Sequence, residues 1–158
     1  MKAIRTLLSA VVVATMLVPA VAQAPRRITL PEALQMIDAA VKESASKNYR
    51  LSFAVVDARG DLVALVRMPG AGANTPDTAI GKAMAAAFFG QPSASLAAGA
   101  NTPLRVSLNE STGGRLRYIQ GAVPIVRDGV TVGAIGASGA NSQQDEDMAK
   151  SGMAVLPR

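Results

Sequence analysis

The spacing of apolar side chains changes along the chain, and the first regular stretch has the period of a helix. Leu34 and Val41 fall on one helical face. Ahead of them, Thr29 is followed three residues later by Glu32, which has the form of a capping box. The pattern therefore predicts a helix over 30–45.

Two apolar runs follow, and a second helical stretch comes after them. The runs 51–57 and 62–67 flank a turn-forming segment, so we predict that they pair as a β-hairpin. A loop rich in Gly, Pro and Asn is expected within 68–78. Thr75 is a candidate N-cap for the second helix, which continues through an alanine-rich stretch and ends at Gly90.

The second half of the chain is predicted to contain most of the strands. Residues 91–114 are dotted with Pro, Gly, Ser and Asn, so we expect irregular structure with one short helix over 93–98. Arg115 and Arg117, at alternate positions, are expected to face solvent. Three strands are then predicted, the last two joined by a tight turn at 128–129: 116–121, 122–129 and 130–138.

The C-terminal segment is predicted to form a last helix. Ser142 can cap this helix, and its first turn would hold Asp145, Glu146 and Asp147. These acids are expected to complement the helix dipole rather than to hold a metal ion. Because the strands pair as hairpins, we predict an α+β fold with a single, mainly antiparallel sheet of about five strands flanked by helices.

The first 22 residues have a different pattern from the rest. Lys2 and Arg5 precede an almost wholly apolar run over 6–21, as in a secretory signal peptide. Cleavage after Ala22 is expected, because the alternative site two residues later leaves a proline next to the cut. The mature domain would then cover 23–158 in a periplasmic or secreted location. An uncleaved anchor helix is the alternative.

Composition narrows the range of partners. The chain has 158 residues and a net charge of +5, which falls to +3 when Lys2 and Arg5 are removed with the signal. Basic residues are scattered and only 3% of residues are aromatic, so neither a phosphate-binding patch nor a base-stacking platform is expected. We therefore predict no nucleic-acid partner and no stable membrane anchor after cleavage.

The chain contains no histidine and no cysteine, which excludes several kinds of site. A Ser-His triad, thiolate catalysis, structural zinc and disulfide bonds all require one of these residues. The glycines of 133–139 lack the spacing and the strand-to-helix context of a dinucleotide-binding motif. Without disulfide bonds, the domain must be held together by its core, or by its core and subunit interfaces.

Three stretches of the chain closely resemble the GlcG/HbpS family, whose relatives include the C-terminal domain of PduO-type proteins. They are AVVDARGDLVALVRMPGA, TAIGKAMAAAFF and GAVPIVRDGVTVGAIGASGANSQQDEDMAKSG. The resemblance implies a small sheet flanked by helices, homo-oligomers and, in some members, haem binding, with a haem-degrading label on the family. This chain departs from the pattern because it has no histidine that could be an axial haem ligand.

The glycine-rich strand 130–138 raises two alternatives. Both of its faces carry small or apolar residues, so we predict a central strand covered on both sides. The glycines would permit close packing of a helix, or the approach of a ligand or a neighbouring subunit. On the second interpretation Gly136, Ser138 and Gly139 are ligand-binding candidates, and the family resemblance favours that interpretation.

Two basic residues are the other candidates for a binding site. Arg67 and Lys82 match positions where relatives usually have the same residue types, and they could converge on a carboxylate or propionate. Alternatively, Lys82 extends its ammonium to solvent along the helix, and Arg67 pairs with Asp57 or Asp61.

The leading interpretation is an exported, homo-oligomeric small-molecule-binding protein whose ligand is haem or another anionic apolar molecule. One alternative is an enzyme that acts on a small hydroxy acid or degrades haem, with Lys82 or Tyr118 as acid or base. Another is a structural subunit that binds no ligand. Haem would be bound without His or Cys, leaving Met68, Met84, Tyr49 or Tyr118, an external ligand, or none.

Overall fold

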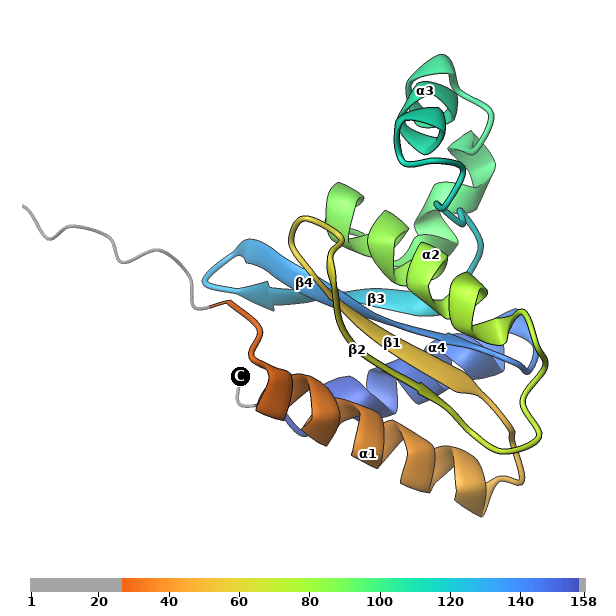
Figure 1. Ribbon diagram of the computed structural model, residues 1–158. Coiled ribbons are helices and arrows are strands. Elements are labelled where there is room, and N and C mark those ends of the chain that lie inside the picture. The colour runs from red at the N-terminus through yellow and green to blue at the C-terminus, as the bar shows by residue number, and fades with distance from the viewer. Residues whose placement is uncertain (1–26, 157–158) are drawn as a thin grey trace, which may run out of the picture.

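Four strands form one antiparallel sheet in the order β2-β1-β4-β3 in the computed structural model, which describes residues 27–156 (Figure 1). The strands are β1 (Ser52–Asp57), β2 (Leu62–Arg67), β3 (Ala122–Arg127) and β4 (Val130–Ser138). Helices cover both faces of the sheet. The predicted α+β class is therefore confirmed, and so is the prediction that strand 130–138 is central.

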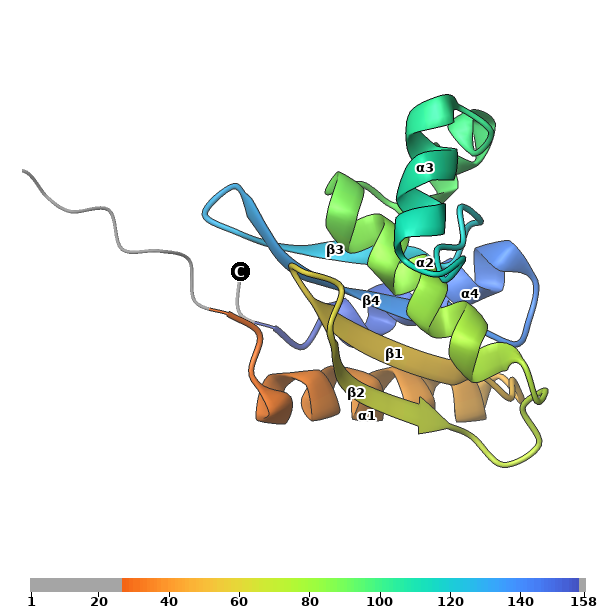
Figure 2. The same ribbon diagram turned by 45° about the horizontal axis from the view of Figure 1, so that its top comes forward.

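The helices divide unequally between the two faces (Figure 2). Helices α1 (Leu30–Ser46) and α4 (Ser142–Met153) cover one face, and α2 (Thr75–Phe89) alone covers the other. Alternate side chains of the strands point to opposite faces of the sheet and form two hydrophobic cores. Phe53 and Ile135 pack toward α1 and α4, whereas Val56 and Ala134 pack toward α2.

Short-range signals in the sequence account for several element ends. The amide of Glu32 donates to Thr29 Oγ1, and the amide of Thr29 donates to Glu32 Oε2 at 2.9 Å, so the predicted capping box is present. Asp128 and Gly129 both have positive φ, as the tight turn between β3 and β4 requires. Gly90 ends α2 with a φ of 62°.

Two predicted caps are wrong by one residue. Asn141, rather than Ser142, caps α4, because its side chain accepts from the amide of Gln144 at 2.9 Å. Thr75 lies inside the first turn of α2, where its hydroxyl donates to the carbonyl of Gly72 at 2.8 Å. In each case the residue before the predicted cap occupies the N-cap position: Asn141 for α4 and Asn74 for α2.

Residues 91–114 are more regular than predicted. They contain a 3₁₀ helix, η1 (Ser93–Gly99), and an α-helix, α3 (Pro103–Ser111), that stand beyond α2 (Figure 1). The α3 helix has no fully buried residue, and only its Leu108 packs partly against the core, so its apolar period is too short to indicate a helix. The short helix predicted over 93–98 is confirmed as η1.

Arg105 attaches the α3 segment to the body of the domain. Its guanidinium donates to the carbonyl of Leu96 and lies 5.1 Å from the ring centre of Phe89 and 5.6 Å from that of Tyr118. The hydroxyl of Tyr118 donates back to the carbonyl of Arg105 at 3.0 Å. One basic residue thus joins α3, η1 and α2.

The strand predicted over 116–121 is absent, and the described sheet has four strands rather than about five. This segment packs on α2 instead, because the amide of Arg117 donates to the carbonyl of Gly81 at 3.1 Å. Leu116 and Tyr118 are buried in the core beside α2. Their alternation with exposed residues arises from contact with a helix, not from a sheet.

Gly136 allows α2 to lie directly on β4. A Cβ built on Gly136 would lie 2.4 Å from the carbonyl oxygen of Ala79 and 3.0 Å from the amide of Ala83, which is backbone that cannot move aside cheaply. Close helix packing therefore explains this glycine.

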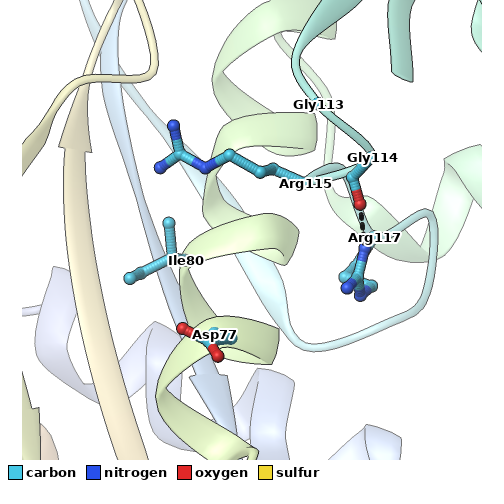
Figure 3. Close-up of a pocket in the computed structure, with 6 residues that line it drawn as sticks. All are labelled: Asp77, Ile80, Gly113, Gly114, Arg115 and Arg117. Carbon is cyan, nitrogen blue, oxygen red and sulfur yellow. Dashed lines mark hydrogen bonds between the residues drawn. The ribbon is translucent and has the colours of Figure 1, made fainter. Parts of the chain in front are cut away.

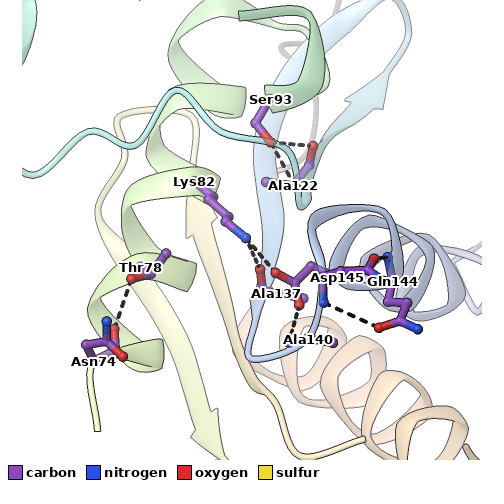
Figure 4. Close-up of polar contacts among 10 residues, drawn as sticks. Asn74, Thr78, Lys82, Ser93, Ala122, Ala137, Ala140, Gln144 and Asp145 are labelled. Atoms are coloured by element: carbon purple, nitrogen blue, oxygen red, sulfur yellow. Dashed lines mark hydrogen bonds and ion pairs between the residues drawn. The ribbon is translucent and has the colours of Figure 1, made fainter. Parts of the chain in front are cut away.

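A buried ion pair connects the helices on opposite faces of the sheet. Lys82 of α2 reaches past the end of β4 and donates to Asp145 Oδ2 of α4 at 2.7 Å and to the carbonyl of Ala137 at 3.1 Å (Figure 4). Both side chains are almost fully buried, with exposed fractions of 2% and 3%. Burial of two opposite charges is tolerable only when both find such partners.

We expect Gly136→Ala to destabilise the fold by about 3 kcal/mol, at the upper end of the cost of overpacking a core. The reason is the clash between the new methyl group and the backbone of α2. Gly72→Ala is the matched control, since its Cβ would meet only side chains, the methyl group of Thr75 at 3.3 Å and Asn74 Oδ1 at 3.6 Å. Urea unfolding followed by circular dichroism measures both, and equal losses would contradict the packing argument.

We expect Asp145→Ala to cost about 3–5 kcal/mol of unfolding free energy, because it leaves the Lys82 ammonium buried without its counter-ion. The double variant Lys82→Met with Asp145→Leu should be more stable than Asp145→Ala. Lys42→Met is the control, because Lys42 pairs with Asp38 on the surface and should change stability little. A double variant no more stable than the single one would contradict this account.

Candidate functional site

Three of the five residues predicted to bind a ligand lie at one end of the sheet. Ser52 of β1 pairs with Arg67 on β2 and with Ser138 on β4, so Ser52 lies between Arg67 and Ser138 across the three strands. Gly139 follows directly after β4. The hydroxyl of Ser52 is hydrogen bonded to that of Thr75 at 2.7 Å, which connects this end of the sheet to the start of α2. Ligand binding by these residues stays a prediction.

Arg67 holds the loop that follows β2. Its Nε donates to the carbonyl of Gly72 at 3.3 Å, and its Nη2 donates to the carbonyl of Ala71. The alternative that Arg67 pairs with Asp57 or Asp61 is wrong: Asp57 Oδ1 instead accepts two backbone amides of its own turn. The guanidinium is therefore partly occupied by the backbone.

Lys82 is enclosed, and the alternative in which its ammonium reaches solvent is wrong. A Cβ on Gly121 would lie 2.5 Å from Lys82 Nζ, so backbone closes over the ammonium on that side too. Burial raises the pKa of Asp145 above its ordinary value, while hydrogen bonds from Lys82 and from the amide of Ala140 oppose the rise. A ligand carboxylate could reach Lys82 only by displacing Asp145.

The two glycine candidates are both in close contact with protein backbone. Gly136 faces α2, as described above. Gly139 has a φ of +139°, and a Cβ there would lie 2.5 Å from the carbonyl oxygen of Arg50. The approach that these glycines permit within one subunit is the approach of other segments of the same chain.

The acidic residues of α4 have different roles. Asp145 is in the first turn, as predicted, but it accepts from Lys82 and from the amide of Ala140 at 3.0 Å. Glu146 accepts from Lys150 at 2.6 Å. Asp147 lies beyond the first turn and accepts from a glutamine side chain. Within residues 27–156, no group of three or more acidic residues is placed to hold a metal ion.

The side chains considered as haem ligands or as acid and base lie away from the pockets described below. Met68, Met84 and Tyr118 are buried in the two cores, and Tyr49 packs partly against one of them. Burial raises the pKa of Tyr118, and the nearby Arg105 charge opposes the rise. Catalysis by Lys82 or Tyr118 stays a prediction, and in one subunit both groups are occupied by protein partners.

A groove lies between α4 and the edge strand β3. Its volume is about 360 Å³, compared with about 210–260 Å³ for three other surface pockets of the described chain. Pockets for drug-sized ligands begin near about 300 Å³ and have mainly apolar walls. The groove is lined by Ile125, Val126, Arg127, Lys150, Met153, Ala154 and Leu156.

The two basic residues of the groove differ in how far the protein occupies them. Arg127 Nη2 donates to Glu32 Oε1 at 2.9 Å, and both side chains are less than one-fifth exposed. Lys150 donates to Glu146, but 54% of its side chain is exposed. Glu146 Oε2 is buried and accepts no hydrogen bond within residues 27–156. Lys150 is therefore the cation better placed to meet an anionic ligand.

The amino-acid sequence alone does not identify the groove. Lys150 and Met153 are three residues apart on the last helix, which places them on one face. That spacing was the available signal, but nothing in the sequence shows that this face borders an edge strand. The groove residues on β3 precede those on α4 by more than twenty positions.

No helix among residues 27–156 has the length and apolar character that crossing a bilayer requires. The predicted signal peptide lies outside the described residues.

Comparison with solved structures gives several close matches. A double mutant of HbpS from Streptomyces reticuli is 28% identical, with a TM-score of 0.74, over 95% of this chain and 100% of that one. The ORFY protein of Klebsiella pneumoniae is 25% identical, with a TM-score of 0.76, over 89% and 99% of the two chains. A crystal structure of a PduOC:heme complex is 25% identical, with a TM-score of 0.73, over 83% and 96%.

No curated protein sequence matched this chain. A family model did match, over residues 28–154, and its description is haem degrading protein HbpS-like. The match covers all four strands and every helix described above. The chain therefore belongs to the HbpS-like family.

Proposed function

We propose that this protein is an exported, homo-oligomeric small-molecule-binding protein, that its ligand is anionic and largely apolar, and that haem is the first candidate. The observation that carries the proposal is the groove between α4 and β3. It combines apolar walls, a half-exposed lysine and a volume within the range of ligand pockets. The family membership and the similarity to a PduOC:heme complex support haem in particular.

The residues of the groove fit the general demands of haem. A porphyrin needs apolar contact, and Ile125, Val126 and Leu156 supply it. A propionate needs a charge-assisted donor, and Lys150 supplies it. The thioether of Met153 is a known type of haem ligand, and the chain has no His or Cys to take that place.

Each groove residue would have a distinct part in binding. Glu146 would orient Lys150 through their hydrogen bond, and Arg127 would keep the wall at β3 in place through its bond to Glu32. The bound haem would supply an iron centre able to exchange electrons. We infer no catalytic step in the groove.

Assembly into homo-oligomers is consistent with the apolar surface that one subunit exposes. Val126 and Val155 are 51% and 41% exposed beside the groove, and Leu30 and Leu34 of α1 are 53% and 48% exposed. Most of the glycine-rich strand β4 is covered on both faces within one subunit, so we place the assembly surface elsewhere. A second subunit would reduce the apolar surface in contact with water.

We expect haemin to bind the mature protein saturably, and Lys150→Met to weaken binding by roughly tenfold, the value of one charge-assisted hydrogen bond. Met153→Leu should alter the Soret spectrum if the thioether reaches the iron. A haemin titration followed at the Soret band measures both. Lys47→Met is the matched control, since Lys47 forms the same i,i+4 pair with Glu43 away from the groove.

Two results of this titration would count against the proposal. A tight transition with a six-coordinate, bis-nitrogen spectrum would contradict the ligand set, because the chain has no histidine. Loss of binding in Arg67→Ala, with Lys150→Met unchanged, would move the site to the end of the sheet where Arg67 and Ser138 lie.

We expect native mass spectrometry of the exported protein to show a chain that begins at Gln23 and several copies per particle. The same spectrum reports any retained ligand. A start at Met1 or Pro25 would contradict the predicted cleavage. A mass equal to one chain at every concentration would contradict assembly.

A further inference from the structure

A second, smaller pocket lies on the outer side of α2, away from the groove between α4 and β3. Its volume is about 240 Å³, and it shares no lining residue with the groove. Asp77 and Ile80 of α2 form one wall, and the segment 113–117 forms the other (Figure 3). This pocket plays no part in the function proposed above.

Backbone contacts fix the walls of this pocket. Gly81 lets the segment 115–117 sit directly on α2: a Cβ there would lie 2.3 Å from the carbonyl oxygen of Arg115. The amide of Arg117 donates to the carbonyl of Gly81 at 3.1 Å. Gly113 and Gly114, with φ of +70° and +74°, turn the chain into this position. The pocket is therefore formed before any ligand arrives.

Two of the three charged side chains that line this pocket are unpaired. Asp77 and Arg115 make no ion pair or side-chain hydrogen bond within residues 27–156. Arg117 is oriented by donating to the carbonyls of Gly114 and Leu116 at 2.7 and 3.0 Å, and the rest of its guanidinium is uncommitted. By contrast, Lys82 and Lys150 each pair with a carboxylate.

The composition of the pocket specifies the charge of a complementary ligand. Two guanidinium groups and one carboxylate carry a net charge of +1, so a ligand with two carboxylates and one ammonium would neutralise it. Arg115 and Arg117 extend in different directions, which suits two separate carboxylates better than one shared between them (Figure 3). A volume of about 240 Å³ limits the ligand to a small molecule.

We propose that this pocket binds a small acidic amino acid of the aspartate or glutamate type. Arg115 and Arg117 each receive one carboxylate, and Asp77 receives the ammonium group. Ile80 contacts the short carbon chain between them. Asp77 lies in the first turn of α2.

Isothermal titration of the mature protein with aspartate, glutamate, succinate and alanine tests the proposal. Aspartate or glutamate should bind at least about tenfold more tightly than succinate, which lacks the ammonium, and than alanine, which lacks the second carboxylate. Arg115→Gln should weaken that binding by roughly tenfold or more. Asp77→Asn should remove the preference for aspartate over succinate.

Arg59→Gln is the matched control, because Arg59 is a surface arginine that pairs with Asp61 outside this pocket. Circular dichroism checks that every variant is folded. We expect Arg115→Gln to fold normally, because Arg115 is exposed. The proposal is overturned if neither acidic amino acid binds at about 10 mM, if succinate or alanine binds equally well, or if Arg59→Gln weakens binding as much as Arg115→Gln. None of these outcomes bears on haemin binding, so the two proposals fail separately.

Discussion

Helix α2 lies between two backbone surfaces, and most of the structure depends on how closely it fits there. Gly136 removes the side chain that would separate the helix from β4, and Gly81 removes the one that would separate it from the segment 115–117. Both contacts are with carbonyl oxygens, which cannot rotate away as a side chain can. This explains why five of the fifteen residues of α2 are alanine, since larger residues would push both surfaces apart.

The same close fit determines the environment of Lys82. Its side chain starts from the buried side of α2, so it cannot leave the protein without opening the contact with the sheet. It extends past the end of β4 and meets Asp145, which belongs to the helix on the opposite face. The sheet is therefore tied at this end by a charge pair as well as by apolar packing. The cost of removing both charges from water is offset by the additional acceptor at Ala137 and the donor at Ala140.

The sequence predicts those parts of the fold that local patterns control. The capping box of α1, the Asp128–Gly129 turn and the central position of β4 follow from spacing and residue type alone. The sequence does not predict a packing contact whose partner is far away in the chain, or is a helix where a strand is expected. The 116–121 segment alternates like a strand but packs on a helix, and α3 is too short and too exposed to show a clear helical period.

Local sequence patterns predict even less of the candidate sites than of the fold. Arg67 and Lys82 attract attention in the sequence because they are charged residues in apolar surroundings. Their partners are a nearby loop carbonyl and a carboxylate 63 residues away, and no periodicity reports either one. Both pockets likewise combine segments that are far apart in the chain, so their residues look unrelated until the fold brings them together.

The degree to which each charge is satisfied by the protein separates structural roles from ligand-facing roles. Lys82 is enclosed by a carboxylate and a carbonyl, and any ligand that reached it would have to replace both. Lys150 has one carboxylate partner and keeps half of its side chain in water, so it can bind a second anion without losing the first. Arg115 has no partner within the described chain, and its desolvation by a ligand carboxylate would break no existing bond. Both proposed sites therefore rely on the charges that the fold leaves least occupied.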